Sequence, residues 1–125
     1  MIGAKGPKML RVAARHADTG SWYVEERSDL VEFGPRLATI EAACLEVGRD
    51  PASIGRSAGI IVEPTDVTGA AEALAIPLRG PAEEIADGLR AFRAGGFTQI
   101  EILLWPRTLA ALEAMAPVLE LLDAD

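Results

Sequence analysis

Short runs of apolar residues alternate along the chain with longer segments in which apolar residues recur every three or four positions. The short runs predict buried strands, and the longer spacing predicts helices that bury one face. Strands that alternate with helices are typical of an α/β fold with a parallel sheet. Because 125 residues are enough for one hydrophobic core, we expect a single domain over residues 1–125.

Turn and cap residues mark where the predicted helices begin and end. Pro7 opens the first helix with Gly6 as its cap, since the first helical position loses nothing by lacking an N–H. Gly48 closes the second helix, and Pro117 predicts a kink or a restart in the last. The predicted helices cover residues 7–17, 37–47, 81–94 and 109–122.

Three strands are predicted from apolar runs, over residues 21–24, 58–62 and 97–104. Pro64 is expected to stop the second strand, and Pro106 prevents simple continuation of the third. The Ala-rich segment 66–76 is expected to form a short helix or a structured loop. These elements together predict a parallel α/β architecture.

The charge balance bears on the partners that we expect. There are 19 acidic and 12 basic residues, with a net charge of −7, and no basic run, so neither nucleic acid nor an anionic membrane is expected to bind. The apolar run 102–105 is too short to cross a bilayer, and we expect a soluble cytoplasmic protein. Cys44 is the only cysteine and is expected to be a buried small hydrophobe.

The turn before the first helix is the strongest candidate for binding. Glycines let backbone N–H groups approach an anion closely, and the helix that opens at Pro7 directs its positive end to the same point. Lys5 and Lys8 are the only lysines and add charge there. The alternative is an ordinary strand-to-helix turn with two solvated lysines. The candidate residues are Gly3, Ala4, Lys5, Gly6, Pro7, Lys8 and Met9.

The remaining candidates for chemistry have simpler structural interpretations. His16 is the only histidine, so a metal cluster or a Ser-His-Asp triad within one chain is not expected. Trp105 follows a predicted strand, where it either borders a ring-shaped ligand or is a packing aromatic or an interface residue. Glu83 and Glu84 are explained by the positive first turn of a helix. No residue is assigned as a catalytic acid or base, and no metal site is predicted.

Three stretches in this order resemble the luciferase-like monooxygenase family of FMN- or deazaflavin-dependent oxidoreductases: residues 2–18, 42–57 and 80–97. The resemblance implies a (βα)8 TIM barrel of which this chain supplies about the last four parallel βα units, a partial barrel, because a complete one needs about 250 residues. It also implies that the turn from Gly3 to Met9 holds a cofactor phosphate. One departure is local, since Asp18 and Trp22 are spaced further apart than in the family, which leaves the role of Trp22 open.

This resemblance implies a cofactor-binding partial barrel, with hydride transfer by a deazaflavin coenzyme or oxygen activation by reduced FMN once the site is complete. Since Met1 lies near the end of the first matching strand, the N-terminal half of the barrel is expected to be absent. Two unpaired edges and an apolar face would favour a homodimer or a separate N-terminal half-barrel chain as partner. The alternatives are a non-catalytic scaffold or interaction module, or one subunit of a split oxidoreductase.

Overall fold

Parallel strands form a single sheet in the computed structural model, which describes residues 2–3, 6–64 and 75–125. Strand β1 (Ile2–Gly3) pairs with β2 (Thr19–Tyr23), and β2 pairs with β3 (Gly55–Pro64). The long strand β3 also pairs with β4 (Leu78–Gly80) and with β5 (Gln99–Leu104). The predicted α/β fold with a parallel sheet is therefore confirmed.

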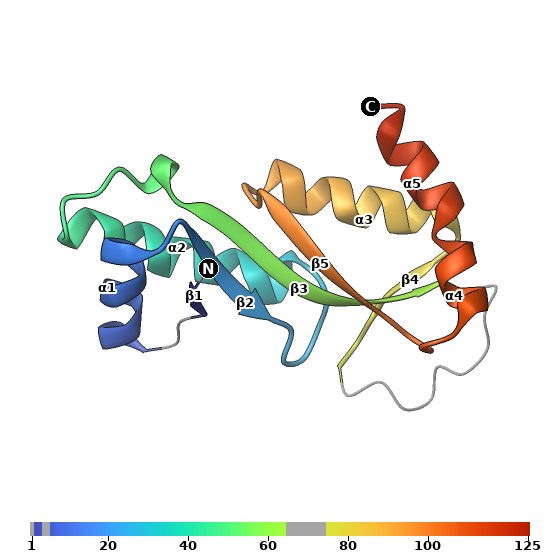
Figure 1. Ribbon diagram of the computed structural model, residues 1–125, viewed down its shortest axis with the longest axis horizontal. Helices are drawn as coiled ribbons and strands as arrows, with labels where there is room; N and C mark the ends of the chain where they lie inside the picture. The colour runs from blue at the N-terminus through green and yellow to red at the C-terminus, as the bar shows by residue number, and fades with distance from the viewer. Residues whose placement is uncertain (1, 4–5, 65–74) are drawn as a thin grey trace.

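Helices lie at both ends of this sheet. The α-helices are α1 (Pro7–His16), α2 (Leu30–Glu46), α3 (Ala82–Ala94), α4 (Leu109–Ala114) and α5 (Ala116–Asp123), and a 3-10 turn, η1, covers Pro51–Ser53. In Figure 1, β2, β3 and β5 run side by side through the centre, with α1 and α2 towards one end and α3, α4 and α5 towards the other. None of the helices in the described ranges is long and apolar enough to cross a membrane.

The two faces of the sheet carry different side chains because successive residues of a strand point to opposite sides. One face packs Trp22, Ala58, Ile60 and Val62 against the helices, in the same buried cluster as Leu37, Ile40, Ile85 and Leu89. The rings of Phe33, Phe92 and Phe97 meet edge to face in this cluster, with centroids 5.5 to 6.0 Å apart. The opposite face carries Ser21, Tyr23, Ser57 and Glu101, and is the more polar one.

Arg49 joins the end of α1 to the turn that leads into β3. Its guanidinium donates to the carbonyl oxygens of Ala14 and Ala17, at 3.1 and 2.6 Å, and to the Ser53 hydroxyl at 2.9 Å. The last carbonyl groups of a helix have no partner within the helix, so this arginine satisfies them. Part of the sequence stretch on which the family resemblance depends therefore has a structural role.

Helix boundaries differ from the prediction where capping overrides the apolar stripe. The start of α1 at Pro7 with Gly6 as cap is confirmed. Helix α2 begins earlier than predicted, at Leu30, because the Asp29 carboxylate caps it by accepting from the Val31 N–H at 3.0 Å. Pro81 is the cap of α3 rather than its first residue.

The predicted last helix is two helices. The break falls at Met115, ahead of Pro117. Pro117 has no N–H to donate to the carbonyl group one turn earlier, and its ring crowds that turn, so of the predicted kink or restart the structure has the restart.

Strand boundaries differ from the prediction mainly because polar residues enter the strands. The strand predicted over 21–24 begins at Thr19 and ends at Tyr23, and the one predicted over 97–104 begins at Gln99. Strand β3 extends the predicted 58–62 at both ends, since Ser57 and Glu63 find polar partners in Glu101 and Arg79. Strand β4 was not predicted.

The segment 66–76, expected to be a short helix or structured loop, lies outside the described residues except for its end. There Ile76 forms a parallel bridge with Arg27, so this end of the segment is extended rather than helical.

Candidate functional site

The predicted binding turn lies where β1 leads into α1, and its described residues are open to solvent. Gly3 ends β1 opposite Ser21 of β2, and Gly6, Pro7, Lys8 and Met9 are exposed. Ala4 and Lys5 lie outside the described residues. The structure therefore places the described part of the predicted set together, at the carboxyl end of the first strand.

The N-terminus of α1 has the backbone features that an anion requires. Gly6 has φ +78°, a conformation that other residues rarely adopt, and a Cβ atom there would meet open space. No side chain of a described residue caps the helix and its first turn carries no acidic residue, whereas the side chains of Asp29 and Thr108 cap α2 and α4. The first N–H groups of a helix have no partner within the helix, and together with the Lys8 ammonium they favour a phosphate.

The other residues singled out in the sequence lie in the core or at the ends of helices and strands. Trp22 is buried in the helix-facing core, and Cys44 is fully buried, which raises the pKa of its thiol through desolvation. His16 ends α1, as expected for a residue near the negative end of a helix. Glu83 and Glu84 lie in the first turn of α3 as predicted, and Trp105 directly follows β5. Among the described residues, no three His, Cys, Asp or Glu side chains gather as metal ligands.

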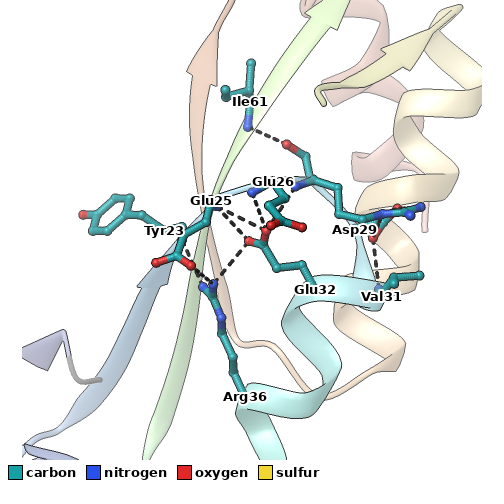
Figure 2. A network of polar contacts seen from close by, with 10 residues as sticks. Tyr23, Glu25, Glu26, Asp29, Val31, Glu32, Arg36 and Ile61 are labelled. Carbon is teal, nitrogen blue, oxygen red and sulfur yellow. Dashed lines mark hydrogen bonds and ion pairs between the residues drawn. The ribbon is translucent and has the colours of Figure 1, made fainter. Parts of the chain in front are cut away.

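A polar network that the sequence did not predict lies at the carboxyl end of β2 (Figure 2). The Glu32 carboxylate, in the first turn of α2, accepts the backbone N–H groups of Glu25, Glu26 and Arg27 at 3.0, 2.6 and 3.1 Å. Arg36, one turn along α2, lies 3.4 Å from the same carboxylate and donates to the Tyr23 carbonyl oxygen at 3.0 Å. The Glu32 side chain therefore holds three successive residues of the β2–α2 loop.

The β2–α2 loop, which Glu32 holds, also contacts the central strand β3. Ser28, which is buried, accepts the backbone N–H of Ile61 in β3 at 3.1 Å through its hydroxyl oxygen. Arg27 and Asp29 pair at 2.6 Å, and this hydrogen bond lowers the pKa of the Asp29 carboxyl. Charged residues in a loop gave no periodic signal, which is why sequence reasoning did not find this network.

A second polar group lies on the face of the sheet that points away from the helix-facing core. The Tyr23 hydroxyl donates to one oxygen of Glu101 at 2.8 Å, and the Ser57 hydroxyl donates to the other at 3.1 Å. The hydrogen bond to Glu101 raises the pKa of the Tyr23 phenol. The parallel register brings the three together, since Tyr23 and Glu101 both lie opposite Gly59 on adjacent strands.

Solved structures with the same fold act with a deazaflavin. The chain superposes on the coenzyme F420-dependent tetrahydromethanopterin reductase from Methanopyrus kandleri over 96% of its residues and 50% of that chain, with TM-score 0.69 and 16% identity. An F420-dependent secondary alcohol dehydrogenase, solved with an F420–acetone adduct, matches with TM-score 0.67 and 13% identity, over 96% of this chain and 47% of that one. The chain thus shares their α/β fold with a parallel sheet and spans about half of their length.

Sequence comparison gives a shorter match. A phthiodiolone/phenolphthiodiolone dimycocerosates ketoreductase from Mycobacterium sp. strain JLS is 43% identical over 54 residues, which are 42% of this chain and 13% of that protein. No family model matches the chain.

Replacing Glu32 with Gln is expected to loosen the β2–α2 loop. The amide cannot accept the loop N–H groups with the strength of a carboxylate, so the free energy of unfolding should fall by about 2 kcal/mol. Urea denaturation measures the loss, and faster hydrogen exchange at the Glu26 and Arg27 amides locates it. The matched control is Glu46→Gln, whose carboxylate is exposed and contacts Arg11 only at 3.8 Å. Equal effects of the two substitutions would contradict the account.

Tyr23 is the only tyrosine, so its ionisation can be followed by phenolate absorbance. Because the hydrogen bond to Glu101 raises its pKa, the transition should lie above pH 10.0 and move down in Glu101→Gln. The stabilising effect of this hydrogen bond is fully present below the pKa of the phenol in the unfolded chain. It is lost as the pH rises through the pKa of the phenol in the folded chain. A transition that does not move in Glu101→Gln would refute the contact.

Proposed function

We propose that this chain is the cofactor-binding part of a luciferase-like, deazaflavin-dependent oxidoreductase, corresponding to about the last four βα units of its barrel. The observation that carries the proposal is the likeness over 96% of the chain to two F420-dependent enzymes. The three stretches of sequence resemblance point to the same class. A cytoplasmic location is part of the proposal.

The proposed cofactor contact is the turn between β1 and α1, formed by Gly3, Ala4, Lys5, Gly6, Pro7, Lys8 and Met9. Its described part fits a phosphate, because Gly6 leaves open space in front of an uncapped helix N-terminus and Lys8 adds a positive charge. When bound, a deazaflavin supplies hydride transfer, and the protein supplies binding and orientation. F420 is favoured over FMN because both solved relatives use F420. FMN, and with it a monooxygenase reaction, is the second candidate.

Binding of F420 is measured by quenching of Trp22 and Trp105 fluorescence, with FMN titrated in parallel. We expect saturable quenching by F420, weakened about tenfold in Lys8→Gln, which is the size of one lost contact between an ammonium and a phosphate. Arg15→Gln is the matched control, since it removes the same charge at the other end of α1 and should leave the affinity unchanged. Saturation by FMN alone would move the proposal to FMN, and no saturation by either would overturn it.

Self-association is the second part of the proposal. Among the described strands β5 pairs only with β3, and the chain spans about half of the solved structures, so one sheet edge is open to a further strand. We expect a homodimer, and light scattering at micromolar concentration should give twice the mass of one chain. A single-chain mass would favour a separate N-terminal half-barrel chain as partner, or a non-catalytic scaffold if F420 also fails to bind.

A further inference from the structure

We propose that Tyr23, Ser57 and Glu101 form a binding site for a small organic cation with an apolar body. The site lies on the sheet face that carries these polar side chains, on strands β2, β3 and β5. The contacts of this cluster define the site, which therefore does not depend on the proposed function.

Glu101 is a partly buried carboxylate without a cationic partner among the described residues. Its contacts are two hydroxyl donors, Tyr23 at 2.8 Å and Ser57 at 3.1 Å. The carboxylates of Glu32, also partly buried, and of the buried Glu63 are in contrast each paired with an arginine. A carboxylate that loses solvent without a counter-charge is costly, so the site favours a cation supplied from outside.

The Tyr23 ring adds a surface that suits the same ligand. The ring lies on Gly59, where a Cβ atom would come within 2.3 Å of it, so only glycine permits this position. Tyr23 is nevertheless 60% exposed, which leaves ring surface open next to Glu101. The face of an aromatic ring attracts cations, and the adjacent carboxylate strengthens that preference.

A buried hydroxyl without a partner gives independent support. Ser21 is 3% exposed, and its hydroxyl oxygen makes no hydrogen bond with any described residue. It lies two residues before Tyr23 in β2 and opposite Ser57 in β3, so it faces the same side of the sheet. Buried polar atoms in native proteins nearly always have partners, and a ligand or an ordered water at this cluster would supply one.

A cavity of about 390 Å³ adjoins the cluster, with Gly59, Ile61 and Leu103 in its lining beside Tyr23 and Glu101. This volume is within the range of small-molecule sites, and the aliphatic side chains suit an apolar body. The two oxygens of Glu101 each keep a lone pair that a planar amidinium can use with both of its N–H groups. The net charge of −7 also attracts cations.

Benzamidine is the probe, because it joins a planar cation to an apolar ring, and benzamide is its neutral counterpart. Calorimetric titration of the full chain should show saturable binding of benzamidine and at least tenfold weaker binding of benzamide. Glu101→Gln should weaken the binding of benzamidine at least tenfold. Glu120→Gln, which removes an exposed charge on α5, should leave that binding unchanged. Tyr23→Phe keeps the ring and should retain most of the affinity, while Tyr23→Leu should lose it.

Circular dichroism establishes whether each variant is folded. If Glu101→Gln does not fold, the binding of benzamidine to Tyr23→Leu tests the proposal. Equal binding of benzamide and benzamidine would overturn the proposal, as would binding that survives the loss of Glu101 or of the Tyr23 ring. Absence of saturation up to about 10 mM benzamidine would overturn it as well, since binding weaker than this is not specific recognition. None of these outcomes alters the response to F420, so the two proposals fail separately.

Discussion

The Glu32 carboxylate is the contact on which the arrangement of the polar face depends. It gathers three successive backbone N–H groups of the β2–α2 loop, and Arg36 ties that cluster to the last carbonyl group of β2. Backbone N–H groups next to a sheet need hydrogen-bond acceptors, and the Glu32 carboxylate accepts those of the loop. Its negative charge also interacts favourably with the positive end of the α2 dipole. This clamp holds the backbone that directly follows Tyr23, the last residue of β2.

The sheet separates structural and candidate functional residues by face. On one side, aromatic and aliphatic side chains from β2, β3 and β5 pack against α2 and α3. On the other side, hydroxyl and carboxylate groups of the same three strands contact one another between adjacent strands. A one-residue shift of register would exchange these faces, so the packing of the core also determines which polar groups meet.

Much of the fold could be predicted from sequence, because glycine, proline and the apolar spacing act locally. The start of α1 at Pro7 follows from such a local signal, and so does the burial of Cys44. The start of α2 at Leu30 was missed because only the apolar stripe was followed, although Asp29 with Glu32 three residues later is the spacing of a helix N-terminus. The meeting of Tyr23 with Glu101 depends on strand pairing far along the chain, for which a single sequence carries no pattern.

The central claim is that the turn between β1 and α1 holds the phosphate of a deazaflavin. Amide chemical shifts of the isotope-labelled chain, recorded with and without F420, test it most directly because they locate the contact. The account predicts saturable shifts at the amides of Gly6, Lys8 and Met9, and at neighbouring Ser21, with α5 unaffected. Shifts that avoid this turn, or no shifts at saturating F420, would contradict it.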